Sequence, residues 1–413
     1  MLQSCAQNAP GRRIELTRAQ DEHFNTMPDP HSLAHLLIPP KHKVKPRPQT
    51  FATEAVPNVS TMRLLVLSHI ADWDFGPQVT ACGHEIVAWV RTTWARGQRY
   101  SHRSQAVSAT IRTIFSQPKP IRTIQPKFDT WTWLEKEKIL RIPCPNVNAP
   151  RFIEYVKDLN VDLIVVCVFP QILKAAILHT PRLGVINCHP SLLPRYAGPQ
   201  PEFWMLKNGE SLAGVTVHVM TEGIDAGDIV AQRELIVGET ENIAQLSQRQ
   251  HHAAASLLTE SVNAMARGTV ELKPQNIAER NYFGKKKAAD TMVDWNGSAR
   301  QIMNLLRALQ PYEPITAYLN GRTIKVYEAQ PQEGAVSGGA PGQIMARQPG
   351  RLLVQTGNGY LEIQSYEIAP FHGWINRILQ KIMMPSVGYR FDLAPAATEP
   401  APNGPRKNSV PTP

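Results

Sequence analysis

The sequence predicts an α/β fold, in which a Rossmann-like, mostly parallel sheet is followed by a small OB-like β-barrel domain. Three observations predict this fold. Short apolar runs alternate with segments of helical period through the first two thirds of the chain. Shorter strand-like runs, separated by turn residues, occupy the later part. The 413 residues, 42% of them hydrophobic, are enough for two folded cores.

The first folded unit is predicted over residues 62–273. Its apolar runs have the length of buried strands and lie at Arg63–Ser68, 84–90, 161–168, 184–188, 215–220 and 228–232. Helical segments are expected at 152–160 and Ile243–Arg267. Strands that alternate with helices in this way favour a parallel sheet with right-handed crossovers.

The second folded unit is predicted over residues 295–394. A helical period at 298–309 is followed by short strand-like runs at 315–319, 322–327, 342–345, 351–355 and 360–364. Asn320-Gly321 and the TGNG at 356–359 mark turns between them, as is typical of a five-stranded barrel. Around these units we expect a poorly ordered extension at 1–61, a basic linker at 274–294 and a loose tail at 395–413.

Composition limits the classes of partner and compartment. The formal net charge of +10 favours an anionic partner. No apolar run is long enough to cross a membrane, and the N-terminus lacks the pattern of a secretion signal. The five cysteines contain no CxxC pair, so we expect reduced thiols in a cytoplasmic protein. No metal is expected, since His251 and His252 are adjacent and lack partners at ligand spacing. No pattern indicates an obligate protein partner.

The candidate catalytic residues lie between Gly184 and Asp228. In GVINCHPSLLP, Asn187 and His189 are two residues apart at the end of a strand, so their side chains share a face. Pro190 ends the strand and places both at its carboxyl edge, where open α/β sheets hold their sites. Asp225 follows in the turn EGIDAGDI. An imidazole with a carboxylate can move protons, and a neutral amide can donate to an oxyanion. Each residue alone is more common as a structural or turn residue.

The amino-acid sequences of these segments, taken together, are more specific than any one of the three residues. NCHPSLLPRYAGPQP followed by GVTVHVMTEGIDAGDI closely resembles the signature of the 10-formyltetrahydrofolate-dependent formyltransferases. VDWNGSARQIMNLLRALQPYEPITAYLNGRTIKVYEA, PGQI and TGNGYLEI resemble the C-terminal barrel of the members that act on methionyl-tRNA. The likeness runs in patches from about 161 to 364. It departs from the family at RLLVLSHIADWDFG and between 90 and 161, where the acceptor would bind.

The resemblance implies roles for named residues. Asn187 would hold the formyl oxygen, His189 would stabilise the oxyanion and pass protons, and Asp225 would orient His189. It also implies 10-formyltetrahydrofolate as the formyl donor, with no metal. The residues implied to contact the folate are Ser191, Leu192, Leu193, Pro194, Phe169, Ile172, Leu173, Gly223 and Ile224.

The amine that accepts the formyl group is suggested by basic segments. Between 91 and 127 there are eight Lys or Arg residues and no acid, with aromatic residues interleaved. This pattern fits a solvated surface, or a loop that grips RNA phosphates and stacks on an exposed end. The acceptor-binding residues predicted for initiator tRNA are Arg96, Arg99, Arg103, Lys285, Lys286 and Lys287.

Three alternatives remain at this point. YFGKKKAADTMVDW is similar to the interdomain segment of some formyltransferases that act on the amino sugar of a nucleotide sugar. A catalytically silent RNA-binding protein would not need the intact Asn187, His189 and Asp225. A formyltetrahydrofolate hydrolase would need neither the added barrel nor the basic loop. Methionyl-tRNA is therefore the predicted acceptor, and the nucleotide sugar is the alternative.

Overall fold

The computed structural model describes residues 60–70, 73–92, 128–332, 338–369, 378 and 386–392. Most of the extension predicted over 1–61, the run that holds Arg96, Arg99 and Arg103, and the tail predicted over 395–413 lie outside the described residues. Within the described ranges, no helix combines the length and the apolar character that a membrane span requires.

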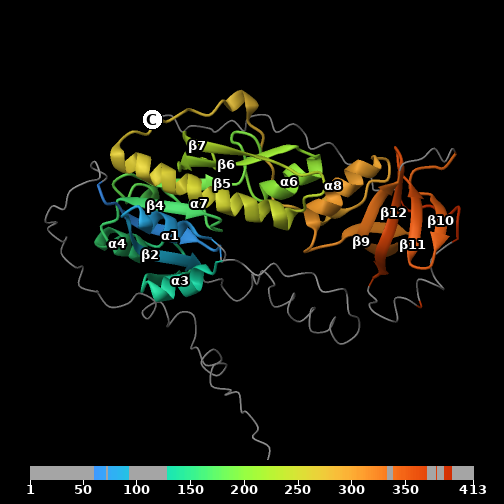
Figure 1. Ribbon diagram of the computed structural model, residues 1–413, viewed down its shortest axis with the longest axis horizontal. Coiled ribbons are helices and arrows are strands. Elements are labelled where there is room, and N and C mark those ends of the chain that lie inside the picture. The colour runs from blue at the N-terminus through green and yellow to red at the C-terminus, as the bar shows by residue number, and fades with distance from the viewer. Residues whose placement is uncertain are drawn as a thin grey trace, which may run out of the picture. The chain divides into compact units, whose positions relative to one another are not determined.

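A seven-stranded sheet forms the core of the first domain, in the order β3-β2-β1-β4-β5-β6-β7 (Figure 1). Its first five strands are parallel, and β6 and β7 add to one edge as an antiparallel pair. The mostly parallel sheet predicted from the sequence is confirmed. The strands are β1 (Arg63–Ser68), β2 (Glu85–Thr92), β3 (Leu140–Cys144), β4 (Leu163–Cys167), β5 (Val185–His189), β6 (Leu212–Val219) and β7 (Ile229–Ile236).

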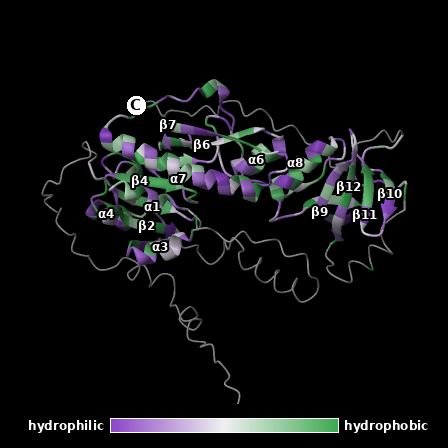
Figure 2. Cartoon of the chain, viewed as in Figure 1, coloured by the Kyte–Doolittle hydropathy of each residue, from purple (hydrophilic) through white to green (hydrophobic). Residues whose placement is uncertain are grey.

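Helices bury both faces of this sheet. Leu64 and Val66 of β1 belong to a core with α1 (Phe75–Ala81), α3 (Thr130–Lys136) and α7 (Ile243–Arg267). Leu65 and Leu67 belong to the opposite core, with α4 (Pro150–Asp158) and α5 (Ala175–Leu178). Neighbouring residues of one strand point to opposite faces, so an uninterrupted apolar run is needed here. Figure 2 shows hydrophobic residues along the central strand β4 and mixed residues along α7.

Helix α7 has the bounds that the sequence predicts because its ends carry clear signals. The Asn242 side chain accepts from the Gln245 backbone N–H, and the Gln245 side chain accepts from the Asn242 N–H. These two hydrogen bonds form a capping box. Gly268 follows the last turn with φ +67°, in the left-handed region that favours glycine. Strand β3, in contrast, was not predicted. It is an edge strand whose Pro143 breaks the usual strand pattern.

The C-terminal domain is a five-stranded antiparallel sheet in the order β10-β11-β12-β9-β8. Backbone hydrogen bonds join the segment 388–392 to Gly342 and Ile344 at the start of edge strand β10, and to Tyr318 of edge strand β8. This segment therefore connects the two edges of the sheet. Strands β9 and β12 are longer than the sequence predicted. The elements are α8 (Ala299–Leu309), β8 (Ile315–Leu319), β9 (Arg322–Gln332), β10 (Ile344–Gln348), β11 (Arg351–Gln355) and β12 (Tyr360–Ile368).

The connection predicted over 274–294 is hydrogen-bonded to the first domain along much of its length. It contains the short 3₁₀ helices η4 (Ile277–Glu279) and η5 (Ala288–Thr291). Close by, α6 (Pro201–Asn208) and α8 share one hydrophobic cluster, in which Phe203 and Leu206 join Ile302 and Leu305. A polar composition therefore does not indicate a free linker in this chain.

Candidate active site

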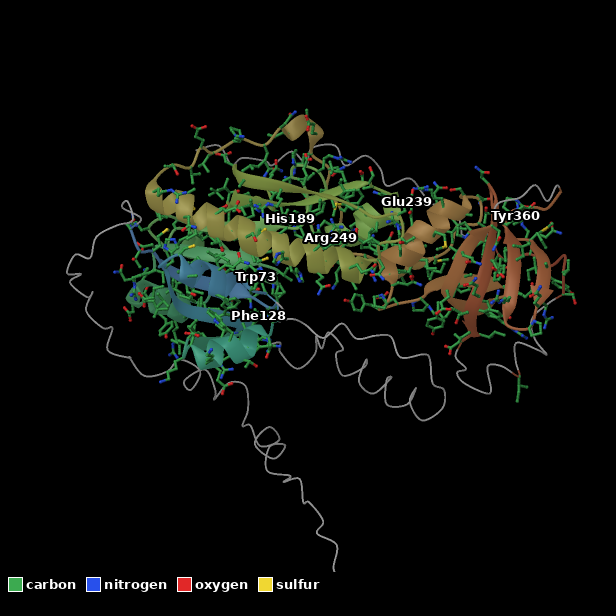
Figure 3. All side chains as sticks on the ribbon, in the orientation of Figure 1. Trp73, Phe128, His189, Glu239, Arg249 and Tyr360 are labelled. Carbon is green, nitrogen blue, oxygen red and sulfur yellow. The ribbon has the colours of Figure 1, made fainter. Side chains whose placement is uncertain are left out.

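Strand β5 carries the first two candidate catalytic residues to the edge of the sheet. The strand lies between β4 and β6 and ends at His189, because Pro190 has no N–H to continue the ladder. Asn187 is partly buried, and His189, labelled in Figure 3, is 6% exposed. Cys188, between them, points into the core on the other side of the strand. The common face predicted for Asn187 and His189 follows from this alternation.

Asp225 meets His189 from the turn between β6 and β7. Its Oδ1 lies 3.6 Å from His189 Nδ1. The other imidazole nitrogen, Nε2, donates to the backbone O of Tyr196 at 2.9 Å. The Gly198 N–H donates to Asp225 Oδ2 at 2.8 Å. The Tyr196 carbonyl can only accept, so Nε2 carries a proton, and Nδ1 faces the Asp225 carboxylate.

A second histidine, His218 of β6, completes the cluster and was missed by reasoning from the sequence. It pairs directly with Asn187 across the β5–β6 register and is 1% exposed. Its Nε2 lies 3.1 Å from Asn187 Nδ2 and 3.8 Å from Asp225 Oδ1. Burial lowers the pKa of His218 to about 4 and outweighs the nearby Asp225 carboxylate, which raises it. The imidazole is therefore neutral at neutral pH.

The hydrogen bonds decide the tautomer of His218. Its Nδ1 lies 3.0 Å from the Val219 carbonyl, which can only accept, so Nδ1 carries the proton. Nε2 is then an acceptor, and it takes one N–H of the Asn187 amide. This orients the amide nitrogen and leaves its second N–H free to donate elsewhere. The signal in the sequence was the alternation in VTVHV, which places His218 on the face opposite to Val217 and Val219.

These four side chains can perform acyl-type chemistry. An amide N–H and an imidazolium can together stabilise an oxyanion, which is usually the largest single contribution to such catalysis. The carboxylate can hold the imidazolium and help to take a proton from a nucleophile. Among the described residues, no group of three His, Cys, Asp or Glu side chains could hold a metal ion.

Comparisons with known proteins agree with this chemistry. A family model described as formyl transferase matches residues 90–262, and one for its C-terminal domain matches residues 285–371. The chain is 37% identical over 223 residues to the methionyl-tRNA formyltransferase of Pelobacter propionicus, an alignment that covers 54% of this chain and 69% of that one. The chain belongs to the formyl transferase family.

Two further proteins are similar to this chain, one in sequence and one in fold. The methionyl-tRNA formyltransferase of Syntrophus aciditrophicus is 37% identical over 224 residues, covering 54% of this chain and 72% of that one. The crystal structure of an N-formyltransferase from Helicobacter canadensis, in complex with folinic acid and dTDP-3-aminofucose, matches with a TM-score of 0.52. That match covers 74% of this chain and all of the other, at 14% identity, and so supports the fold alone.

The residues that the formyltransferase resemblance implied for folate fall into two groups. Exposed apolar side chains border the catalytic edge: Ile172 is 68% exposed and Ile224 is 47% exposed. Val168, which the sequence did not single out, is 46% exposed, with a left-handed φ of +48° that is unusual for a β-branched residue. Phe169 is half-buried, with its ring centre 5.8 Å from that of His69 in a tilted arrangement, and Gly223 is exposed in the turn before Asp225.

The other group is buried within the formyltransferase domain itself. Ser191 Oγ donates to the Arg195 carbonyl, and the Leu193 N–H donates to Thr216 Oγ1. Leu193 is 3% exposed, and Leu173 belongs to the core beside α4 and α5. Pro194 is buried as well, and Leu192 is half-buried. Because the side chains of Ser191, Leu193 and Leu173 are buried, we predict that any contact of these residues with folate is made by their backbone atoms.

The candidate acceptor-binding residues of this formyltransferase lie partly inside and partly outside the described residues. Arg96, Arg99 and Arg103 lie outside the described residues. Lys285 and Lys287 are exposed, whereas Lys286 is paired with Glu313 at 2.8 Å. The Lys286 ammonium also lies 5.4 Å from the centre of the Phe203 ring, in a cation–π contact. The packing of Lys286 is that of a residue that joins the two domains, and its charge is already compensated.

Proposed function

We propose that this formyltransferase transfers the formyl group of 10-formyltetrahydrofolate to the methionyl amino group of initiator tRNA. The observation that carries the proposal is the convergence of Asn187, His189 and Asp225 at the carboxyl edge of β5. The acceptor is supported by the relatives of known name, two of which are methionyl-tRNA formyltransferases at 37% identity.

The chemistry follows from the positions of the three side chains. The amine nitrogen attacks the formyl carbon and the carbonyl oxygen becomes an oxyanion. The free N–H of Asn187 and the imidazolium of His189 stabilise this oxyanion. Asp225, which lies 3.6 Å from His189, accepts the proton that the amine loses, by way of water. The bond from the formyl carbon to the folate nitrogen then breaks, and that nitrogen takes up a proton.

A folate site beside these residues is supported by the exposed apolar side chains of Val168, Ile172 and Ile224. Large hydrophobic side chains in contact with water cost free energy, so exposed apolar residues in the loops that flank the catalytic residues fit a flat heterocycle. The exposed Gly223 lets the chain approach such a ring closely.

The catalytic assignment is tested by Asn187→Ala and His189→Ala. Each should lower kcat by about 10²–10³-fold, because removal of a single preorganised oxyanion donor typically costs that much. Far-UV circular dichroism and thermal unfolding serve as controls for the fold. Formylation by either variant at a near-normal rate would remove these residues from the mechanism.

The acceptor is tested by offering the unmutated protein 10-formyltetrahydrofolate with methionyl-initiator tRNA or with a nucleotide-linked amino sugar. Formyl transfer to the tRNA alone is expected. Its KM should rise with salt, and Arg96→Ala/Arg99→Ala/Arg103→Ala should weaken that dependence, because each neutralised phosphate contributes a log–log slope of about 0.7–0.9. Formylation of the sugar alone would transfer the proposal to the nucleotide-sugar class.

A further inference from the structure

The connection between the two domains is hydrogen-bonded to the two backbone segments that flank the candidate active site. Its residues 275–283, here called the strap, begin after an isolated bridge between Ile229 and Lys273. They end beside a second bridge, which pairs Ala197 with Tyr282. The strap is therefore anchored to the edge strand β7 at one end and to the loop after β5 at the other.

One end of the strap binds the turn that carries Asp225. Gln275 Nε2 donates to the backbone O of Asp225 at 3.0 Å and to that of Gly227 at 2.7 Å. Arg280 Nη1 donates to the same Asp225 O at 3.0 Å, and its Nη2 donates to Ile224 O at 2.6 Å. Four hydrogen bonds thus reach three carbonyl groups in one short turn.

This turn needs external support. Asp225 has a φ of +47°, in the left-handed region, which costs an L-residue roughly 1–2 kcal/mol. Two donors on the Asp225 carbonyl and one each on the Ile224 and Gly227 carbonyls oppose relaxation to an ordinary conformation. They fix the direction in which the Asp225 carboxylate leaves the backbone.

The other end of the strap binds the loop 196–198. The Tyr196 N–H donates to the Asn281 side chain, the Ala197 N–H donates to Asn281 O at 3.1 Å, and the Phe283 N–H donates to Ala197 O at 2.9 Å. The phenyl ring of Phe283 also stacks on the Tyr196 ring at 4.9 Å. This loop supplies one contact to each member of the acid–base pair, since Tyr196 O accepts from His189 and the Gly198 N–H donates to Asp225.

We propose that the strap is a positioning element of the active site and that Arg280 and Gln275 are its positioning residues. The strap holds the backbone on both sides of the His189–Asp225 pair, although neither Arg280 nor Gln275 touches the reacting atoms. This inference rests on the proposed function, because it assumes that His189 and Asp225 act in formyl transfer. The segment that joins the barrel to the sheet domain is then part of the catalytic machinery of the sheet domain.

The test uses the full chain and whichever acceptor the unmutated protein formylates. Arg280→Ala removes two hydrogen bonds, and Gln275→Met removes two others at nearly constant volume and charge. Each should lower kcat about 10- to 100-fold, because small displacements of catalytic groups have effects of that size, while KM for the donor changes less than about threefold. Arg280→Lys should retain intermediate activity, because it keeps the charge and one donor.

Two further measurements separate positioning from general stability. Guanidinium chloride at millimolar concentration should restore part of the activity of Arg280→Ala, and the pH–rate profile of this variant should shift, because the His189–Asp225 contact is altered. Arg233→Ala is the matched control: it removes an equal charge and an ion pair with Glu260 at 2.8 Å, away from the strap. That variant should keep kcat and show neither rescue nor a shifted profile.

The outcomes are distinguishable. If Arg280→Ala and Gln275→Met keep kcat within about twofold while His189→Ala is inactive, the strap has no positioning role and the proposed function stands. If His189→Ala is itself active, the proposed function fails first. A variant that loses its thermal transition is replaced by Arg280→Lys, whose unchanged kcat and pH profile would also overturn the inference.

Discussion

At the scale of single residues, the orientation of the Asn187 amide depends on His218 of the neighbouring strand β6. His218 accepts one amide N–H of Asn187 because its own proton is held by the Val219 carbonyl. An amide without this partner could rotate by half a turn and present its oxygen, which cannot donate, to the formyl oxygen. The neutral form of His218 therefore has a function in the proposed mechanism.

Substitution of His218 should separate packing from hydrogen bonding. His218→Phe fills the site but cannot accept, whereas His218→Gln offers a carbonyl oxygen at similar reach. Because an unsatisfied buried donor costs about 1–3 kcal/mol, we expect His218→Phe to lose roughly 10-fold or more in kcat. His218→Gln should lose clearly less. Single-turnover formylation measures both, and equal rates for the two variants would contradict the role in amide orientation.

The same residue predicts how stability depends on pH. The pKa of His218 is about 4 in the folded protein, whereas the ordinary value of 6.5 applies to the unfolded chain. As the pH falls, His218 is therefore protonated at a higher pH in the unfolded chain than in the folded protein. The free energy of unfolding should therefore be highest above pH 6.5 and decrease between pH 6.5 and 4, by roughly 3 kcal/mol from this group. His69, whose pKa burial and Arg91 lower to about 4, acts in the same direction.

Urea unfolding at pH 7.0, 6.0, 5.0 and 4.5 measures this dependence. In His218→Phe, the decrease in the free energy of unfolding over that interval should be smaller by the contribution of His218. An identical pH dependence in the two proteins would show that His218 titrates normally.

At the scale of elements, the turn between β6 and β7 places the Asp225 carboxylate beside His189. The antiparallel pair brings the turn back over β5, and Gly227 makes this possible. A Cβ atom at Gly227 would lie 1.9 Å from the Val219 carbonyl oxygen, a backbone atom that cannot move aside. The glycine is required here by the close approach of two backbone segments.

Gly227→Ala should therefore shift the turn and with it Asp225. We expect a loss of about 1–3 kcal/mol in the free energy of unfolding, as for other overpacked sites, together with a fall in kcat. Gly284→Ala is the matched control, because a Cβ at that position meets no atom within 4 Å. Thermal unfolding and steady-state kinetics of both variants provide the measurement, and equal behaviour would refute the steric argument.

At the scale of the whole molecule, the barrel domain and the sheet domain share a core. One hydrophobic cluster includes Phe203 of α6, Leu305 of α8 and Ile324 of β9. Arg307 of α8 is 9% exposed, and its Nη1 donates to the Gly238 carbonyl at 3.0 Å, beyond the end of β7. The two domains should therefore unfold together.

A single cooperative transition is expected in calorimetry, with coincident changes in far-UV circular dichroism and tryptophan fluorescence. Arg307→Ala should lower the free energy of unfolding by about 1–3 kcal/mol, since it removes the hydrogen bonds that the buried Arg307 side chain donates to the Gly238 and Glu241 carbonyls. Arg351→Ala, which removes an exposed pair with Glu362 at 3.1 Å, should change it by less than about 1 kcal/mol. Two separate transitions in the unmutated protein would contradict a shared core.

The sequence by itself determined the features that depend on short stretches of chain. The apolar run Arg63–Ser68 and the helix Ile243–Arg267 were predicted with their observed bounds, because apolar period and end signals lie within a few residues of each other. Asn187, His189 and Asp225 were selected as candidates because the amino-acid sequences of two neighbouring segments resemble a family signature. Their catalytic roles stay predictions.

Only the tertiary structure decided which distant residues support these three. His218 meets Asn187 through the strand register, 31 residues along the chain, and no local pattern records that pairing. Arg280 reaches Asp225 across 55 residues, from a segment whose polar composition predicted only a linker. Lys286, whose contact with the acceptor stays a prediction, pairs with Glu313, 27 residues along the chain. Hydrogen bonds and ion pairs of this kind depend on distance in space, whereas composition and period describe distance along the chain.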